Sequence, residues 1–149
     1  MPAADRPDGV CETSRRLPFE RAAVFAAFAH ADQLAQWWGP DGFTNAFEVF
    51  EFRPQGRWTF VMQGPDGTRY PNESIFLETA PERVVIHHSC APYFKLTVSL
   101  TEVDGQTELH WRQVFEDAAL VANIRHILEP ANEQNLNRLH RLLADRHSQ

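Results

Sequence analysis

The sequence has few of the features that define several classes of protein. Only two cysteines, Cys11 and Cys90, occur in 149 residues, which is too few for a disulfide framework. We therefore expect a reduced, cytoplasmic protein. The sequence leaves open whether Cys11 and Cys90 pair with each other. The net charge is -6 and no basic run is present, so nucleic acids and anionic membrane surfaces are poor partners. No apolar run approaches the roughly 18 residues of a membrane span.

The chain is instead rich in the residues that fill a core. Hydrophobic residues make up 43% of the sequence and include 11 Phe and 4 Trp. A chain of this length buries roughly 70% of its unfolded surface when it folds. We expect residues 1–9 to form a disordered lead-in without a secretory signal, and residues 10–146 to form a single domain.

The first third of the chain predicts one strand and two short helices. Residues 10–17 have the character of an edge strand, which Pro18 ends. A helical pattern rich in small residues follows over 19–30, and Asp32 can cap a second short helix that ends at Gly39-Pro40.

The middle of the chain predicts consecutive antiparallel strands. Alternation of apolar and polar residues is clearest over 57–63, 94–101 and 109–115, with further strands expected over 43–53, 70–79 and from residue 84. Turn sequences lie between them at 64–67, 80–82 and 104–105. Consecutive hairpins imply an antiparallel meander with one solvated face.

Leucines at helical spacing predict a long amphipathic helix over 130–146, with Pro130 in its first turn and a short helical piece over 118–128 before it. The stripe consists of Leu136, Leu139, Leu142 and Leu143, and it continues toward the N-terminus through Ala131, Asn132 and Asn135. Segregated helices and strands indicate an α+β fold, with a curved antiparallel sheet of about six to seven strands around this helix. The space between sheet and helix in such folds commonly holds an apolar ligand.

Several motifs carry a family resemblance. They are FERAAVF at 19–25, WWGPDGF at 37–43, PERVV at 81–85, His88 with Pro92-x-Phe94, GxTxLxW at 105–111 and ANEQNL at 131–136. In order and spacing, over residues 10–144, the chain resembles the activator of Hsp90 ATPase homologue-like family of the START-like (SRPBCC, Bet v 1-like) superfamily. The resemblance implies the helix-grip fold, in which the sheet grips the C-terminal helix around a hydrophobic cavity. Many relatives carry Gly-Gly where this chain has Gln55-Gly56, which alters one turn.

The resemblance leaves the function open, because its superfamily includes lipid carriers, hormone receptors, aromatase/cyclases and chaperone regulators. Candidate site residues therefore come from the expected inward faces. The apolar candidates for ligand binding are Trp38, Phe60, Met62, Phe76, Phe94 and Trp111. The polar candidates at otherwise apolar positions are Asn72, His88, Gln113, Asn132 and Asn135. Buried polar groups need partners, so these five either form a structural network or bind water or the polar end of a ligand. Either Trp37 or Trp38 can face the cavity.

Catalysis and metal binding have less support. His88 suits general acid–base work, with Glu73 or Glu133 as a group that orients it, but no nucleophile elbow, phosphate loop or paired-carboxylate spacing is present. His87-His88-x-Cys90 is a poor metal site because adjacent strand residues face opposite sides. We expect no metal and no cofactor.

The leading hypothesis is a small-molecule binding protein whose ligand is apolar, lipid-like or aromatic. The alternatives are a cyclase- or dehydratase-like enzyme that uses His88, and a chaperone-interaction module of the Hsp90 regulator kind. Against the last, known eukaryotic activators carry an additional N-terminal domain, for which this chain has no room. A homodimer through an edge strand or a helix face is one option for the oligomeric state.

Overall fold

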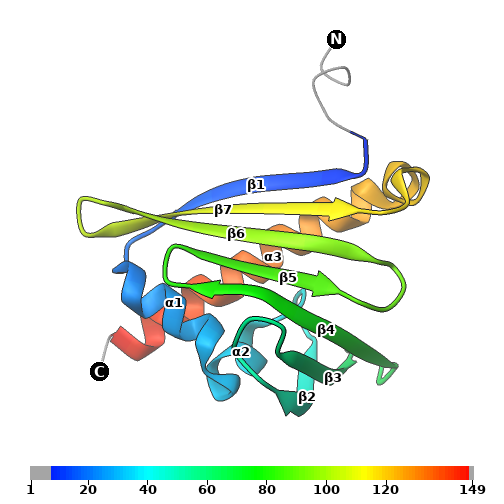
Figure 1. Ribbon diagram of the computed structural model, residues 1–149, viewed down its shortest axis with the longest axis horizontal. Coiled ribbons are helices and arrows are strands. Elements are labelled where there is room, and N and C mark those ends of the chain that lie inside the picture. Colours follow the sequence, from blue (N-terminus) through cyan, green and yellow to red (C-terminus); the bar gives the residue numbers. More distant parts are fainter. Residues whose placement is uncertain (1–7, 148–149) are drawn as a thin grey trace.

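The computed structural model describes residues 8–147, so most of the expected lead-in at 1–9 lies outside the described residues. The chain begins with one strand, two short helices and six further strands, and it ends with a long helix (Figure 1). In order, the elements are β1 (Val10–Leu17), α1 (Arg21–Ala29), α2 (Ala31–Trp37), β2 (Thr44–Phe50), β3 (Arg57–Gln63), β4 (Arg69–Ala80), β5 (Arg83–His88), β6 (Phe94–Val103), β7 (Gln106–Phe115) and α3 (Ala118–His147).

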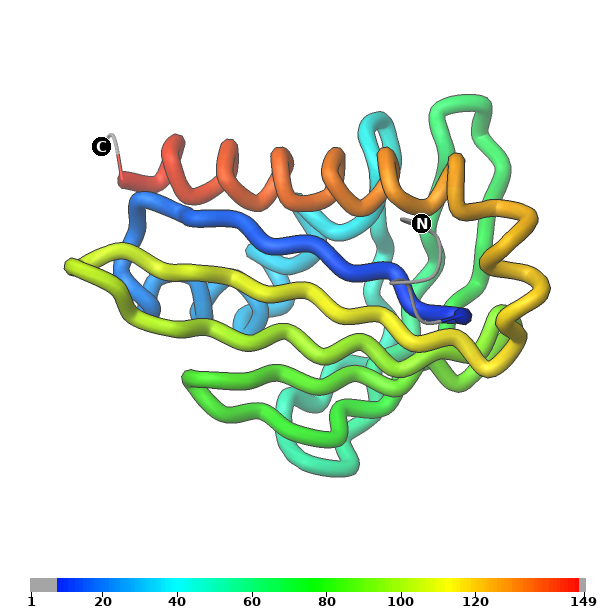
Figure 2. Tube along the Cα trace, turned by 90° about the horizontal axis from the view of Figure 1, so that it is seen from above, coloured from blue at the N-terminus to red at the C-terminus, as the bar shows by residue number. Residues whose placement is uncertain are grey.

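All seven strands form a single antiparallel sheet in the order β1-β7-β6-β5-β4-β3-β2. Strands β2 to β7 follow one another as hairpins, and β1 pairs with β7 at the opposite edge. The long α3 crosses one face of this sheet (Figures 1 and 2), and α2 packs against α3 and β2. The predicted α+β helix-grip fold is confirmed.

Helix α3 differs from the prediction at its start. It is one helix of 30 residues with Pro130 inside it, rather than a short piece followed by a helix that begins at Pro130. Asp117 caps it, since its Oδ1 accepts a hydrogen bond from the backbone N–H of Leu120 at 3.2 Å. An internal proline removes one helical hydrogen bond and bends the helix. Accordingly, Figure 2 shows the first turns of α3 running in a different direction from the rest.

The core lies between the concave face of the sheet and the second half of α3. On the helix, Leu136, Leu139 and Leu143 are fully buried, and Leu142 packs at their margin. The sheet contributes large aromatic residues, of which Trp58, Phe60, Phe76 and Trp111 are almost inaccessible to solvent. This part of the space is closed by side chains, as the leucine stripe predicts.

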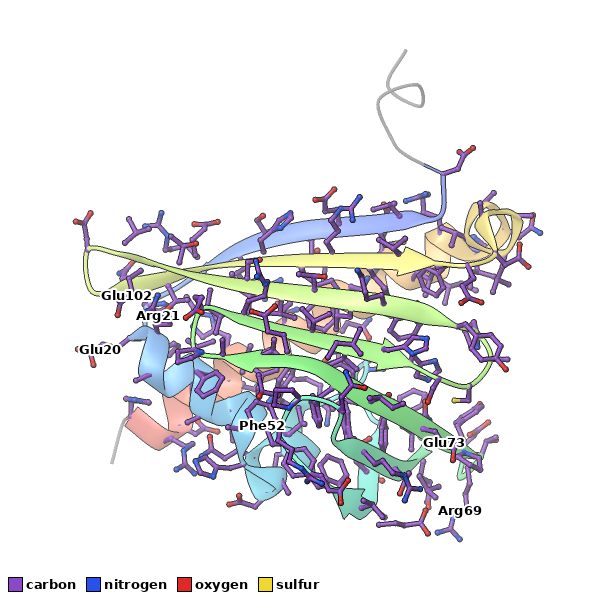
Figure 3. The ribbon with its side chains drawn as sticks, viewed as in Figure 1. Glu20, Arg21, Phe52, Arg69, Glu73 and Glu102 are labelled. Carbon is purple, nitrogen blue, oxygen red and sulfur yellow. The ribbon has the colours of Figure 1, made fainter. Side chains whose placement is uncertain are left out.

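Peripheral contacts fix the helices to the sheet (Figure 3). Arg21 at the start of α1 lies 3.8 Å from the carboxylate of Glu102 on β6, and the ring of Phe52 meets Phe25 of α1 at 5.6 Å between centroids. Arg69 and Glu73, both on β4, lie at the end of the molecule opposite to Arg21 and Glu102. Within residues 8–147, no helix is both long enough and apolar enough to cross a membrane.

The turn before β3 contains Gln55 and Gly56, and the two residues have different backbone requirements. Gln55 has a positive φ of 67°, a conformation that glycine adopts more easily than any other residue. Gly56 follows it, and a Cβ at this position would overlap the carbonyl oxygen of Glu51. Gly56 is therefore sterically required, and Gln55 adopts its conformation at the expense of backbone strain.

Candidate functional site

A pocket of about 250 Å³ lies between the sheet and the first half of α3. Its lining consists of Trp38, Gly39, Pro40, Phe60, Met62, Asn72, Ser74, Ile86, His88, Pro92, Phe94, Leu96, Trp111, Gln113, Leu128, Ala131, Asn132 and Asn135. None of these residues is Asp, Glu, Lys or Arg. The pocket is thus an apolar chamber with a few neutral polar groups.

Strand alternation explains how the sheet supplies one wall. Each of the five strands β3 to β7 contributes two residues of the same parity, such as Phe60 and Met62 from β3 or Trp111 and Gln113 from β7. The antiparallel register aligns these residues across the sheet. His88 on β5 is paired with Ser74 on the neighbouring strand β4 and with Phe94 on the neighbouring strand β6. Alternation in sequence therefore predicts most of this wall.

Helix α3 supplies the second wall through two buried asparagines. The amide nitrogen of Asn132 donates to the side-chain oxygen of Gln113 at 3.1 Å. The side-chain oxygen of Asn135 accepts the backbone N–H of Gly39 at 3.1 Å. These two hydrogen bonds connect α3 to the sheet on one side and to the segment after α2 on the other.

That segment, residues 38–43, provides the third wall through Trp38, Gly39 and Pro40, and one arginine holds it in place. The guanidinium of Arg138 donates to five backbone carbonyls at 2.9–3.1 Å, namely those of Gln36, Trp38, Gly39, Pro40 and Phe43. Partial burial lowers the pKa of Arg138 from its ordinary value, against the attraction of Asp41. Because the guanidinium presents several donors in one plane, it can satisfy a whole turn of backbone at once.

Of the two adjacent tryptophans, Trp38 lines the pocket and Trp37 belongs to the core. The indole N–H of Trp37 donates to the carbonyl of Ala27 at 3.0 Å, and its ring packs edge-to-face on Phe28. Of the two options that the sequence left open, Trp38 is thus the tryptophan on the pocket, and Trp37 is buried in the core rather than packed outward.

His88 is the titratable group of the pocket. Its Nδ1 lies 2.7 Å from the carbonyl of Pro92 and its Nε2 lies 2.7 Å from Oδ1 of Asn72 and 3.5 Å from the sulfur of Cys90, while its ring stacks on Phe94. Burial lowers the pKa of His88, because it penalises the charged ring; hydrogen bonds to the backbone of Pro92 and Cys90 act against that shift. Two oxygen acceptors favour a doubly protonated ring, and burial opposes it.

Neither of the two carboxylates expected to orient His88, those of Glu73 and Glu133, is among its hydrogen-bond partners, which are Pro92, Asn72 and Cys90. Glu133 forms an ion pair with Arg15 of β1 at 2.7 Å. Glu73 meets Cys90 through its backbone N–H, at 3.4 Å from the sulfur. Over residues 8–147, no group of three His, Cys, Asp or Glu side chains is arranged to hold a metal ion.

The indole nitrogen of Trp111 stands out among the lining groups. Trp111 is 1% exposed, and its Nε1 has no hydrogen-bond partner. Leaving a buried donor unpaired costs about 1–3 kcal/mol, so such atoms are uncommon and need an explanation. The sequence makes Trp111 an apolar candidate for ligand binding, but nothing in its pattern identifies the indole N–H as unpaired.

Every predicted ligand-binding residue lines the pocket except Phe76. The prediction placed Phe76 with Asn72 because both face inward on β4. However, four residues of strand span about 13 Å, so Phe76 lies beyond the pocket, where it stacks with Trp58 at 5.6 Å. Shared parity identifies the face of a strand but not the position along it.

Other lining residues were missed. Ser74, Ile86 and Leu96 share the parity of predicted neighbours and could have been included on that signal. Pro92 lies in the β5–β6 loop and Leu128 precedes the expected start of the helix. No periodic pattern identifies these last two.

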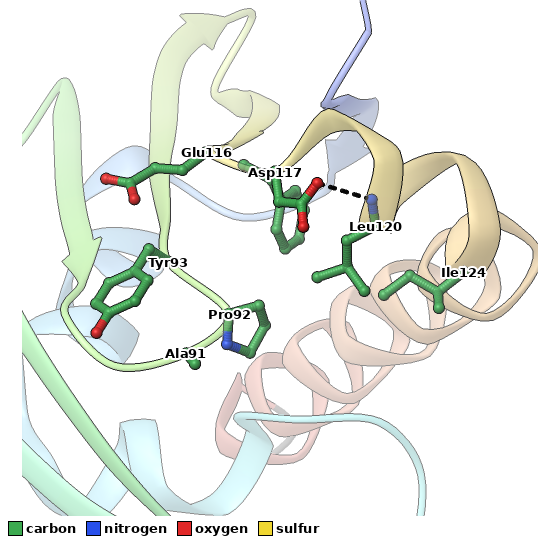
Figure 4. A pocket seen from close by; sticks show the side chains of 8 residues that line it. Ala91, Pro92, Tyr93, Glu116, Asp117, Leu120 and Ile124 are labelled. Carbon is green, nitrogen blue, oxygen red and sulfur yellow. Dashed lines mark hydrogen bonds between the residues drawn. The ribbon is translucent and has the colours of Figure 1, made fainter.

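A wider and more open groove of about 760 Å³ adjoins the pocket at Pro92 (Figure 4). In the close-up, the β5–β6 loop forms one side, with Tyr93 and Pro92, and the first turns of α3 form the other, with Leu120 and Ile124. Pro92 is the one lining residue that the groove and the pocket share.

Comparisons with known proteins agree with this architecture. The family model described as "Activator of Hsp90 ATPase homolog 1-like protein" matches residues 18–144. A crystal structure of a protein from Nitrosomonas europaea is similar over 97% of this chain and 99% of its own, with a TM-score of 0.87 and 18% identity. A solution structure of a protein from Arthrobacter aurescens covers 95% of this chain and 90% of its own, with a TM-score of 0.85 and 20% identity.

A third similar structure, described as the AHSA1 protein from Silicibacter pomeroyi, covers 93% of this chain and 99% of its own, with a TM-score of 0.75 and 22% identity. None of the curated proteins matches the chain. At these identities the solved structures bear on the fold alone.

Proposed function

Since the chain belongs to the activator of Hsp90 ATPase homolog 1-like family, we propose that it is a small-molecule binding protein whose ligand occupies the pocket between the sheet and α3. The observation that carries this proposal is the combination of an unfilled space with an aromatic lining. A core that served stability alone would be close-packed, as the space around Leu136, Leu139 and Leu143 is.

The dimensions favour a compact ligand. A volume of about 250 Å³ corresponds to roughly eight water molecules at about 30 Å³ each. This is slightly below the usual range for drug-sized ligands, about 300–1,000 Å³. The rings of Trp38, Phe60 and Phe94 suit a flat apolar body. An aromatic or alicyclic molecule of one or two rings fits better than an extended acyl chain.

The state of the two cysteines supports a protein that works in a reducing compartment. Cys11 and Cys90 are thiols rather than halves of a disulfide. Disulfides persist in oxidising compartments and are rare in the cytosol. We therefore place the binding protein in the cytoplasm.

Native mass spectrometry of the freshly purified protein tests the proposal, followed by calorimetric titration with neutral one- and two-ring compounds. We expect a co-purified small molecule or a compound that binds with 1:1 stoichiometry. Ala131→Leu, which places bulk in the pocket wall, should abolish binding, whereas Ala122→Leu on the exposed face of the same helix should not. Binding that Ala131→Leu leaves unchanged would place the ligand elsewhere and contradict the proposal.

A further inference from the structure

Two side-chain amides on the pocket wall each use only their oxygen within the protein. The oxygen of Asn135 accepts the backbone N–H of Gly39, and the oxygen of Gln113 accepts a side-chain N–H of Asn132, both at 3.1 Å. A backbone N–H is always a donor, so it fixes the orientation of the Asn135 amide. The nitrogens, Nδ2 of Asn135 and Nε2 of Gln113, have no hydrogen-bond partner among residues 8–147.

Both nitrogens keep some accessible surface although their residues are buried. Asn135 is 6% exposed and Gln113 is 7% exposed. The buried, unpaired side-chain atoms of the described residues that solvent cannot reach are Oδ1 of Asn45 and the indole nitrogens of Trp58 and Trp111. The two amide nitrogens are not among them, and both residues line the pocket. The pocket is therefore the space in which these nitrogens can meet a partner.

The two nitrogens belong to the same end of the pocket, where α3 meets β7. Asn132 bonds to Gln113 and lies three residues before Asn135 on α3. Helical residues at this spacing share a face, with Cβ atoms about 5–6 Å apart. Both donors can therefore serve one end of a ligand. The strand β3, at the other side of the pocket, contributes the apolar side chains of Phe60 and Met62.

An amide nitrogen only donates, so a ligand at this end must bring an acceptor, and that acceptor should be uncharged. No Lys or Arg lines the pocket, and the guanidinium of Arg138 already donates to five backbone carbonyls. A carboxylate would lose its hydration here without gaining a counter-ion. The oxygens of a neutral ester, lactone or ketone need less desolvation and accept the same hydrogen bonds.

We propose that the ligand is a flat, neutral ring compound with a carbonyl group at one end, which the side-chain amides of Asn135 and Gln113 bind through their free N–H groups. Its ring body lies toward Phe60 and Met62. This inference rests on the proposed function and deepens it. It assigns Asn135 and Gln113 as the residues that determine specificity.

Equilibrium dialysis at pH 8 with coumarin, naphthalene and 2-naphthoate tests the inference. Coumarin is a neutral lactone, naphthalene has the same two-ring shape without oxygen, and 2-naphthoate adds a charge and should bind more weakly than coumarin. Asn135→Asp and Gln113→Glu keep the oxygen that Gly39 or Asn132 uses and replace the free nitrogen by an oxygen. Each should lower the affinity for coumarin, relative to that for naphthalene, about tenfold, the size expected for one hydrogen bond to a buried donor. Asn137→Asp, on the exposed face of α3, is the matched control and should leave this ratio unchanged.

The infrared carbonyl stretch of bound coumarin gives a measurement that does not depend on the variants. Accepting hydrogen bonds weakens the C=O bond, so the frequency should be lower on the wild-type protein than in cyclohexane. A bound frequency equal to that in cyclohexane, or one that is lowered but unchanged by both variants, would overturn this inference and leave the proposed function standing. An affinity ratio that neither variant changes would do the same. Failure of all three compounds to bind would overturn both.

Discussion

The side-chain amide of Asn132 on α3 donates to the side-chain oxygen of Gln113 on β7, at 3.1 Å and with both residues buried. This contact joins the pocket wall on the helix to the pocket wall on the sheet. The bond satisfies one donor of Asn132 and the acceptor of Gln113, and the pair acts as a polar brace within an apolar chamber.

Breaking this brace should show strong coupling between its two members. Asn132→Leu or Gln113→Met alone leaves a buried polar group unpaired and should lower the free energy of unfolding by about 1–3 kcal/mol. The double variant replaces both partners by apolar groups of similar size, so it should be no less stable than the better single variant. Urea denaturation of the wild type, the two single variants and the double variant gives the four free energies of unfolding that this double-mutant cycle needs. Additive losses would show that the two side chains act independently.

Arg138 should be hard to replace, even by lysine. Its guanidinium holds four carbonyls of the segment 38–43 and the carbonyl of Gln36 in α2. Arg138→Lys keeps the charge but loses the planar set of donors, so we expect a loss of about 2 kcal/mol in the free energy of unfolding. Arg141→Lys, an exposed change on the same helix, is the matched control and should be neutral. Equal melting temperatures for the two variants would contradict this role.

The turn before β3 should accept a glycine with a gain in stability. Gln55 has a φ of 67°, and relief of that strain outweighs the extra unfolded-state entropy of glycine. Gln55→Gly should raise the free energy of unfolding by up to about 1 kcal/mol. Asp104→Gly is the control, because Asp104 also has a positive φ, of 52°, but aspartate tolerates that region better. A midpoint of denaturation that falls in Gln55→Gly would refute the argument.

The pocket histidine should make stability depend on pH. Burial lowers the pKa of His88 in the folded state, so the unfolded chain binds a proton more readily and stability falls as the pH drops below the ordinary histidine value of about 6.5. The loss continues until the pH passes the lowered pKa. His88→Asn removes this titration. The slope of unfolding free energy against pH, from 7.5 to 5, should therefore be shallower in His88→Asn than in the wild type; identical slopes would exclude His88 as its source.

The sequence predicted the sheet and one wall of the pocket well, for a physical reason. Side chains alternate along a strand, so Phe60, Met62, Trp111 and Gln113 could be assigned to the inward face without coordinates. The same rule could not exclude Phe76, because alternation identifies the face of a strand but not whether a residue lies beside the pocket or beyond its end. The pocket ends along the strand where the leucines of α3 close against the sheet.

The remaining parts of the site depend on contacts that no local pattern contains. The carbonyls that Arg138 holds are about 100 residues away in sequence, and Arg138 reads as an ordinary solvent-facing residue of an amphipathic helix. Alternation places Trp111 on the inward face, but the sequence does not show that its N–H has no partner in the fold. Proline is more common at the start of a helix than inside one, and no local pattern shows that α3 continues through Pro130.

The position of Pro130 within α3 divides the helix into two parts of unequal stability. Proline has no N–H to donate, so the carbonyl of His126 lacks its usual helical partner. The turns before it rest on few contacts, among them the hydrogen bond from Arg125 to the carbonyl of Val10 at 2.8 Å and the buried side chain of Val121. Those turns can open while the leucine stripe stays in place. Amide hydrogens of residues 118–129 should therefore exchange faster than those of 136–143, and the residence time of a ligand should follow this local opening rather than global unfolding.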